Sequence, residues 1–444
     1  MNFNRYILLA LVIAFPFKAH SQDIKFIGSA FIDGKGSDLS GLPSALLEDN
    51  LSPANGLNGF GSALAYTGFQ NRYVLLADRG PNKIEYKGGE DLDNTTSYQT
   101  RFQTFDIQVS EDISKSTGFR LDMKMRGTIL FKNSANEQYI GLSKAYQSAG
   151  TINRRLDPEG IRIAPDGSVW ISDEYGPHIL HFDQFGHEIE KLDVPEEVTI
   201  ANPAPNAKVE MQNNKRGRVT NRGAEGIELT PDGHFLVVAM QSPLIQDGGL
   251  KGLNSRLLIY DLKNKTNKPK QFIYQLDDTK MAISEILAVD NNRFLVNERD
   301  GVAGPTGRKY LYLIDINQNP VPTELSNAGY GSSPSQNLPE TSLPQGIVAL
   351  QKSLFADIGN ILNNAERNGL TVYANSRGLP DKFEGYSWGP ALPNGDNLLL
   401  ASNDNDFETL DTGFPNYVFA FAIPQSKLSG VIVNQLMPGV TFQP

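Results

Sequence analysis

The sequence contains no cysteine among its 444 residues. Disulfide bonds, a thiolate nucleophile, lipid attachment at cysteine and every cysteine-ligated metal site are therefore excluded. Histidine is also scarce, with five residues in the whole chain. A metal site would have to use oxygen ligands, and such ligands favour Ca²⁺ over zinc or copper.

Basic residues are outnumbered by acidic ones. Lys and Arg total 40, whereas Asp and Glu total 50, which gives a formal net charge of −10. Neither nucleic acid nor an anionic membrane surface would meet a basic patch, so we expect neither as a partner. An anionic small substrate stays compatible with this charge, because a few local cations or a bound metal can reverse the local field.

Long apolar runs are missing after the N-terminus. Residues 1–21 have the pattern of a secretory signal peptide, with Arg5 before the apolar run 6–17 and Ala19-His20-Ser21 as the cleavage site. That run is too short to span a bilayer, which argues against a membrane anchor. We therefore expect a periplasmic or secreted monomer, without stable membrane insertion, whose residues 22–444 form a single domain.

What the chain does contain is a repeat, most clearly seen in residues 156–183. Three short apolar runs, at 160–164, 169–172 and 179–182, are separated by the turn Pro165-Asp166-Gly167 and by the charged turn 173–177. Proline followed by Asp-Gly is typical of a tight hairpin turn. Similar units open near Ser62, Asn221, Ile283 and Phe383.

Short meanders that recur at intervals of tens of residues are typical of a β-propeller. We therefore predict an all-β fold: a β-propeller with five visible repeats, and so five or six blades, whose four-stranded antiparallel meanders surround a central channel. A strand at 24–32 would complete the last blade and close the ring, which removes an exposed edge. One helix is expected, at 357–368, and 317–342 reads as a long loop.

The first strand of each blade lines the channel of a propeller, and its opening residue faces the channel mouth. Four repeats open with a carboxylate, namely Glu159, Glu225, Glu285 and Glu384, whereas the first opens with Ser62. Carboxylates around one opening must take up protons, spread apart in water or hold a cation. The sequence thus predicts a Ca²⁺ site formed by these four glutamates; the alternative is that they pair with nearby arginines.

Further charged residues follow the second strands or open the third repeat. These candidate catalytic residues are Asp78, Arg79, Asp173, Glu174, Arg222, Glu298, Arg299 and Asp404. Carboxylates interleaved with arginines suit an anionic substrate, because metal and Arg bind phosphate oxygens while a carboxylate activates water. His178 lies in the same loop as Glu174 and is either an acid or base or an exposed loop residue. Gly385-Tyr386-Ser387-Trp388-Gly389 matches G-x-S-x-G, but a strand-like segment follows it where a nucleophile elbow needs a helix.

Six segments together resemble the bacterial phytase-like family, described as "esterase-like activity of phytase" proteins. They are ADRGP at 77–81, LDPEGI at 156–161, NRGAEG at 221–226, ISEIL at 283–287, ERD at 298–300, and FEG at 383–385 running into GPALPNG at 389–395. The resemblance covers about 56–423 and implies a propeller with repeated Glu and Asp residues. Ser62 departs from the leading glutamate of the other repeats.

The expected function is that of a secreted or periplasmic, metal-dependent hydrolase of phosphoric esters that acts on a small anionic or ester substrate at the channel mouth. Two alternatives remain open from the residues. One is a calcium-dependent carboxylic-ester or lactone hydrolase, and the other is a non-catalytic propeller that binds a ligand or partner at the same face.

Overall fold

A computed structural model describes residues 23–83, 85, 92–146, 152–265, 268–330 and 337–443. The expected signal peptide, residues 1–21, lies outside these residues. The described strands form five separate four-stranded antiparallel sheets. Five blades are therefore present, and the choice between five and six blades that the sequence left open is settled at five.

Four blades are built from consecutive strands, from the channel outwards. The first contains β2 (Phe60–Tyr66), β3 (Arg72–Ala77), β4 (Arg101–Glu111) and β5 (Phe119–Leu130). The second contains β6 (Pro158–Ile163), β7 (Val169–Asp173), β8 (His178–Phe182) and β9 (Glu188–Leu192). The third contains β10 (Ala224–Leu229), β11 (Phe235–Met240), β12 (Asn254–Asp261) and β13 (Lys270–Gln275). The fourth contains β14 (Ala282–Ala288), β15 (Arg293–Arg299), β16 (Lys309–Asp315) and β17 (Lys352–Asp357).

The fifth blade joins the two ends of the described chain. It contains β18 (Phe383–Gly389), β19 (Asn397–Asn403), β20 (Asn416–Ile423) and, as its outer strand, β1 (Lys25–Ile32). β1 pairs antiparallel with β20, from Lys25 opposite Ala422 to Ile32 opposite Asn416. The prediction that a strand at 24–32 completes the last blade is confirmed, and this pairing closes the ring without leaving β20 as an open edge.

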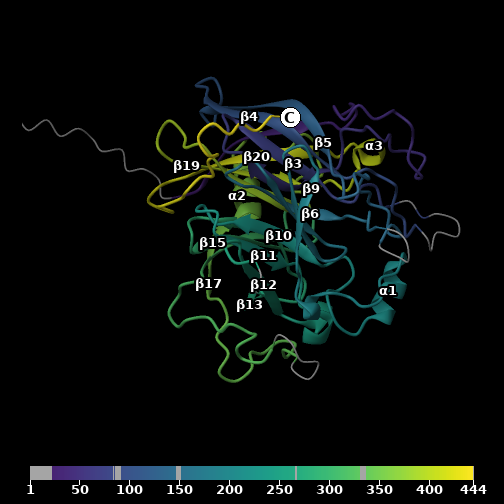
Figure 1. Ribbon diagram of the computed structural model, residues 1–444. Helices are drawn as coiled ribbons and strands as arrows, with labels where there is room; N and C mark the ends of the chain where they lie inside the picture. The colour runs from purple at the N-terminus through teal and green to yellow at the C-terminus, as the bar shows by residue number, and fades with distance from the viewer. Residues whose placement is uncertain are drawn as a thin grey trace, which may run out of the picture.

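The inner strands contact one another in the ring order β2, β6, β10, β14, β18 and back to β2. In Figure 1 the sheet of β10 to β13 lies below the blades that carry β3 and β20, with β15 and β17 to the left and β6 and β9 to the right. All five inner strands run in the same direction along the channel, since each begins its blade. Their first residues consequently gather at one mouth of the channel and their last residues at the other.

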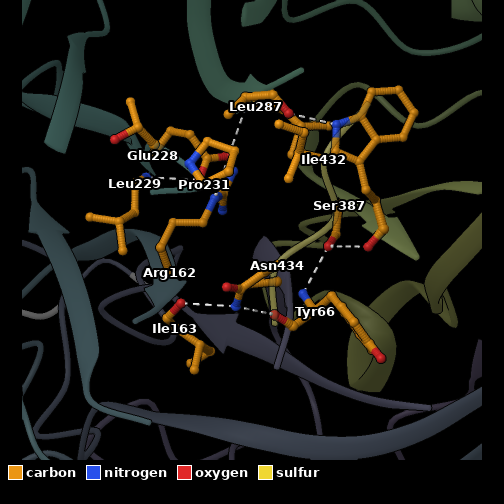
Figure 2. A pocket seen from close by; sticks show the side chains of 14 residues that line it. Tyr66, Arg162, Ile163, Glu228, Leu229, Pro231, Leu287, Ser387, Ile432 and Asn434 are labelled. Carbon is orange, nitrogen blue, oxygen red and sulfur yellow. Dashed lines mark hydrogen bonds and ion pairs between the residues drawn. The ribbon is translucent and has the colours of Figure 1, made fainter. Parts of the chain in front are cut away.

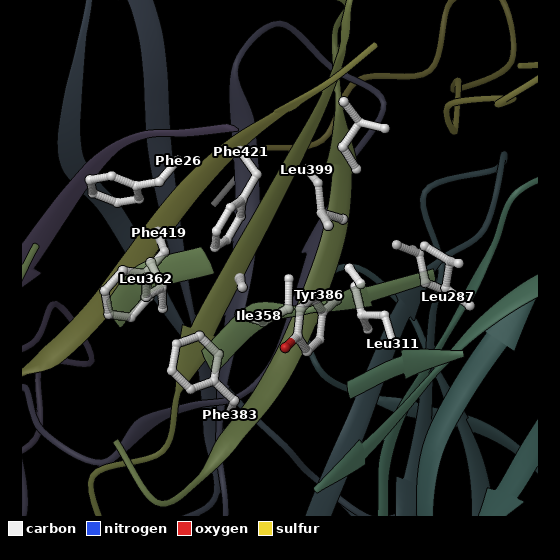
Figure 3. Close-up of a cluster of buried hydrophobic side chains, with 14 of the residues drawn as sticks. Phe26, Leu287, Leu311, Ile358, Leu362, Phe383, Tyr386, Leu399, Phe419 and Phe421 are labelled. Atoms are coloured by element: carbon white, nitrogen blue, oxygen red, sulfur yellow. The ribbon is translucent and has the colours of Figure 1, made fainter. Parts of the chain in front are cut away.

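Five buried hydrophobic clusters lie between neighbouring blades, one for each pair. Both faces of each sheet are thereby covered, which explains why the strands read as nearly continuous apolar runs. Figure 3 shows the cluster between the fourth and fifth blades, where Phe383 and Phe419 stack with ring centroids 5.0 Å apart. Ile358 and Leu362 of α2 (Ile358–Arg367) cover the same cluster.

The helix expected at 357–368 is confirmed as α2. The Asp357 side chain accepts a hydrogen bond from Asn360 N and caps its start. Two further helices, α1 (Ala207–Asn213) and α3 (Thr409–Thr412), were not expected, and both are too short to give a clear periodic signal. Short 3₁₀ turns occupy Glu196–Val198, Ile245–Asp247 and Gly249–Lys251. Within the described ranges, no helix has the length and apolar character needed to cross a bilayer.

Candidate active site at the channel mouth

Every inner strand carries a β-bulge at its first residues. The register shifts between Phe60 and Ala63, Pro158 and Gly160, Ala224 and Ile227, Ile283 and Glu285, and Phe383 and Gly385. A bulge leaves its extra residue unpaired and changes the direction of the side chain. Glu159, Glu225 and Glu384 lie in these bulges, so three of the four leading glutamates occupy equivalent positions at the mouth.

A glycine follows each of these three glutamates because the next inner strand approaches closely. A Cβ atom on Gly160 would lie 2.6 Å from Glu225 O, one on Gly226 would lie 2.7 Å from Ile286 N, and one on Gly385 would lie 2.6 Å from Leu64 N. Glycine is the residue that permits such backbone contact. The Glu-Gly pair is therefore the sequence mark of a bulged, mouth-facing glutamate.

The fourth blade breaks this rule. The residue in its bulge is Ser284, and Glu285 stands where the second, third and fifth blades have glycine. Glu285 Oε1 lies 3.1 Å from Arg162 Nη2, and Glu285 is not among the residues that line the cavity at the mouth. The structure thus places Glu285 apart from the other three leading glutamates.

The mouth opens into a cavity of about 250 Å³. Among the residues that line it are seven of the twelve site residues expected from the sequence: Arg79, Glu159, Glu174, Arg222, Glu225, Arg299 and Glu384. Lys280, Lys382 and Gln241 line it as well. Acids and cations from several blades therefore share one cavity.

Three carboxylates in this cavity are close enough to share a cation. One oxygen each of Glu159, Glu174 and Glu225 lies within 4.8 Å of the other two, and all three residues are buried. Glu225 Oε1 accepts a hydrogen bond of 2.6 Å from Gln241, but Glu225 Oε2 and Glu174 Oε1 have no partner. Within the described residues the Glu159 carboxylate has no hydrogen-bond or ion-pair partner either. Buried acceptors normally find partners, so these oxygens are candidate ligand atoms for a cation.

The pKa values of Glu159, Glu174 and Glu225 are all raised, as expected for carboxyl groups that are buried close together. Burial, followed by the charge of Asp157, raises the pKa of Glu159 well above its usual range. The same two causes raise the pKa of Glu174 to about 8. Burial and Glu174 raise the pKa of Glu225 well above its usual range. A divalent cation would fit this site, because the three glutamates offer hard oxygen ligands. The cation would also offset the electrostatic repulsion among the three carboxylates.

Two arginines of the cavity are already paired. Arg79 donates to both oxygens of Asp157, through its backbone N at 3.0 Å and through Nη1, and lies 3.7 Å from Glu174. Arg299 forms an ion pair with Glu384 and donates to Ser284 Oγ at 2.8 Å. Glu384 Oε2 has no partner. Burial raises the pKa of Glu384 to about 7, although Arg299 and Lys382 oppose the shift.

Two other cations at the rim are free to bind a ligand. Arg222 and Lys280 line the cavity, and in the described part of the chain neither side chain has a hydrogen-bond or ion-pair partner. Arg222 lies just before β10 of the third blade, and Lys280 lies just before β14 of the fourth. An anionic ligand in the cavity would meet positive charge on this side.

A second acidic cluster lies beside the cavity. One oxygen each of Asp78, Asp404 and Asp406 lies within 4.8 Å of the other two, and Asp78 also groups with Asp157 and Glu159. Lys382 neutralises part of this cluster through contacts of 2.8 Å to Asp404 and 2.5 Å to Asp406. Burial and then Asp404 raise the pKa of Asp78 well above its usual range. Asp78 and Asp404 therefore support the wall of the cavity and do not line it.

Asp173 and Glu298 lie outside the cavity lining. Asp173 accepts hydrogen bonds from Asp157 N at 2.8 Å and Gly176 N at 3.0 Å, and its Oδ2 lies 2.6 Å from His178 Nδ1. His178 therefore has a partner and orients the loop that carries Glu174. Glu298 accepts from Tyr274 Oη at 2.9 Å and from Lys352 Nζ at 2.6 Å. These contacts fix neighbouring segments.

The opposite mouth of the channel is narrow, with a pocket of about 50 Å³ (Figure 2). Arg162 and Glu228 pair there at 3.0 Å. Ser387 belongs to strand β18, accepts a hydrogen bond of 2.8 Å from Tyr66 N and donates to Trp388 O at 3.0 Å. The expectation that this G-x-S-x-G match is an ordinary strand is confirmed. Asn434, from the C-terminal segment, bridges Tyr66 O and Ile163 O at 3.4 and 3.0 Å.

The sequence did not single out Gln241, Lys280 and Lys382 as site residues. Gln241 follows the second strand of its blade, as Asp78, Glu174 and Asp404 do in theirs, so the repeat itself carried a signal for it. Lys382 lies two residues before Glu384. Lys280 lies in a polar turn, and nothing in the pattern distinguishes it from a solvated loop residue.

A five-bladed propeller with an acidic cavity at one channel mouth defines the class of this protein. Residues 55–407 match the phytase-like family described as "Esterase-like activity of phytase", and the chain belongs to that family. A protein of Arthroderma benhamiae described as "Uncharacterized secreted protein" is 25% identical over 460 residues, which cover 87% of this chain and 86% of that protein.

Two solved structures show weaker likeness. A gluconolactonase of Xanthomonas campestris aligns with a TM-score of 0.32 and 9% identity, over 83% of this chain and 87% of that one. The tail fibre of Staphylococcus aureus phage P68 aligns with a TM-score of 0.33 and 8% identity, over 93% of this chain and 55% of that one.

Proposed function

We propose that the protein is a secreted or periplasmic hydrolase of phosphoric esters that works with a divalent cation, Ca²⁺ by ligand type, at the channel mouth. The observation that carries the proposal is the set of buried, unpartnered carboxylate oxygens of Glu159, Glu174 and Glu225 beside two unpaired cations. The relative described as secreted supports export. The family description supports ester hydrolysis.

Glu159, Glu174 and Glu225 would hold the cation. When bound, a divalent cation polarises the phosphoryl oxygens and offsets charge that develops on them. Arg222 and Lys280 would bind the remaining anionic oxygens, since they line the cavity and their side chains have no hydrogen-bond or ion-pair partner among the described residues. Arg79 and Arg299, held in place by Asp157 and Glu384, would offset part of the negative charge in the cavity.

Glu384 is the residue we assign as general base. Its Oε2 atom is unpartnered in the cavity, and its pKa of about 7 suits proton transfer near neutral pH. A water oxygen forms the new bond to phosphorus while Glu384 takes its proton. The bond to the leaving oxygen breaks, and that oxygen takes up a proton.

Hydrolysis of three chromogenic esters tests the proposal. The purified mature protein is incubated with p-nitrophenyl phosphate, bis-p-nitrophenyl phosphate and a p-nitrophenyl acyl ester, each with calcium and with chelator. We expect turnover of a phosphate ester that requires calcium, a kcat that falls at least a hundredfold in Glu384→Gln, and a raised KM in Lys280→Ala. Turnover of the acyl ester alone would favour the carboxylic-ester alternative, and no turnover by folded protein would favour the binding module.

A further inference from the structure

A second cavity of about 300 Å³ lies next to the acidic one. Arg79, Thr220 and Asn221 line both, so the two cavities share a wall. The other walls come mainly from connectors between strands, with Asn94 from the β3–β4 connector of the first blade and Ala207 from α1, between the second and third blades. The repeats alone do not account for this cavity.

The connectors that form the cavity are bound to one another. Asp93 accepts hydrogen bonds from Ala207 N at 2.8 Å and from Asn206 Nδ2 at 3.2 Å. Ser143 N donates to Thr95 Oγ1 at 2.9 Å. Three segments that are far apart in sequence thus build one wall, and its shape does not depend on a single loop.

The charged groups of the second cavity are already compensated. Arg155 lies 3.6 Å from Glu210, donates to Ser143 O at 3.0 Å and stacks over the Tyr175 ring at 4.4 Å. Glu210 is paired a second time by Arg218, at 2.8 Å. Unlike the acidic cavity, the described lining of this one offers no unpaired cation.

Two amides are left to bind a ligand. Asn94 and Asn221 line the cavity, and among the described residues neither side-chain amide has a hydrogen-bond partner. An amide both donates and accepts, which matches the hydroxyl groups of a neutral ligand. A ligand part with further phosphates would instead meet Asp93, and the lining arginines Arg79 and Arg155 are already paired with carboxylates.

Resting on the proposed function, we propose that this second cavity binds the part of the substrate that is released, and that this part is a neutral, hydroxyl-bearing group such as a sugar or polyol. The phosphoryl group occupies the acidic cavity, and the hydroxylated group extends past the shared lining residues Arg79, Thr220 and Asn221 into the second cavity. The preferred substrate is then a monophosphate ester of a neutral polyol.

The backbone conformation allows substitutions that remove the side-chain amides without straining the chain. Asn94 has φ +62° and Asn221 has φ +56°, a region that glycine adopts without strain. Asn94→Gly and Asn221→Gly therefore remove the amide and keep the backbone. Asn136 has the same φ of +62° in an exposed turn away from both cavities, so Asn136→Gly is a matched control.

The first measurement compares glucose 6-phosphate with p-nitrophenyl phosphate, which has no hydroxyl on its released ring. Loss of one hydrogen bond to the substrate corresponds to about a five- to tenfold change in binding affinity. In Asn94→Gly we expect the KM for glucose 6-phosphate to rise by that factor relative to the KM for p-nitrophenyl phosphate. Asn136→Gly should leave the ratio of the KM values for glucose 6-phosphate and p-nitrophenyl phosphate unchanged. An unchanged ratio in Asn94→Gly would overturn the proposal.

The second measurement does not depend on turnover. Saturation-transfer NMR with glucose and sorbitol should show binding to the wild-type protein and to Asn136→Gly, and weaker binding to Asn94→Gly and Asn221→Gly. If the sugars bind in this way but no ester is hydrolysed, the proposed function fails and the subsite stands. If esters are hydrolysed but the wild-type protein binds neither sugar, the subsite proposal fails.

Discussion

Glu285 and Arg162 face each other across the channel, with Oε1 and Nη2 3.1 Å apart, below the acidic mouth. Arg162 is also paired with Glu228 at 3.0 Å, so one guanidinium serves two carboxylates. Glu285 Oε2 has no hydrogen-bond partner in the part of the chain that the structure describes. One of the two negative charges is thus incompletely balanced inside the protein, and protonation of Glu285 relieves that imbalance.

This relationship predicts how stability varies with pH. Burial raises the pKa of Glu285 to about 8, although Arg162 opposes the shift. A carboxyl whose pKa is higher in the folded than in the unfolded state stabilises the fold at low pH, and that contribution is lost as the pH rises through the folded pKa. We expect the free energy of unfolding to fall between pH 5 and pH 9, measured in chelator, and to fall less in Glu285→Gln than in the wild type. The difference should be a few kcal/mol, because each unit of pKa difference between the folded and unfolded states corresponds to about 1.4 kcal/mol. Denaturant titrations at both pH values measure this. Parallel pH profiles for the two proteins would show that Glu285 is ionised throughout.

Metal removal provides a second prediction. A ligand that binds only the native state stabilises it by RT ln(1 + [L]/Kd), about 2.7 kcal/mol at a hundredfold excess over Kd. The melting temperature should therefore rise with calcium and fall with chelator. Glu225→Gln should remove most of this response, because it deletes a charged ligand with little change of shape.

Glu285→Gln is the matched control for the metal site. Both glutamates open an inner strand, but only Glu225 lies with Glu159 and Glu174 at the mouth. The calcium response of Glu285→Gln should therefore stay close to that of the wild type. Should the wild type melt at one temperature in calcium and in chelator, with no metal found by elemental analysis, the glutamates would be better explained as partners of the arginines.

Export gives a third prediction. The mature chain should begin at Gln22, because Ala19-His20-Ser21 follows a short apolar run. Mass spectrometry of the protein from its native host measures the N-terminus directly. Recovery of the intact Met1 segment would contradict cleavage.

Much of the fold was predictable because each blade repeats the same chemistry of apolar strand, Asn/Gly turn and polar strand end. The outer strands Lys270–Gln275 and Lys352–Asp357 were not identified, since they are short and, in the fourth blade, follow a long loop. At the mouth, three of the four leading glutamates lie in the bulges, whereas Glu285 lies one residue after the bulge of its strand. Glu285 is followed by Ile286 and not by glycine, and only the three-dimensional register shows that Ser284 takes the bulge. The second cavity was not predictable, because it depends on contacts between connectors that carry no repeat.

The C-terminal segment gives the last prediction. After β20 it crosses the face opposite the candidate active site, where Ile432 N donates to Val289 O at 2.8 Å and Met437 N donates to Pro165 O at 2.7 Å. Phe442 ends the crossing, fully buried in the cluster between the first and second blades, 6.4 Å from the Phe102 ring. The segment thus ties several blades together beyond the β1–β20 pairing.

Phe442→Ala should therefore destabilise the protein by about 3–5 kcal/mol, the usual cost of removing a buried phenylalanine. Met437→Ala is the control in the same segment, because Met437 is 48% exposed and should change stability by less than about 1 kcal/mol. Urea unfolding followed by tryptophan fluorescence measures both, since Trp170 and Trp388 lie in different blades. Equal stability of the two variants would mean that the end of the C-terminal segment does not stabilise the propeller. Calcium binding at the far mouth should persist in folded Phe442→Ala, because among the described residues no hydrogen bond or ion pair joins the three carboxylates to this segment.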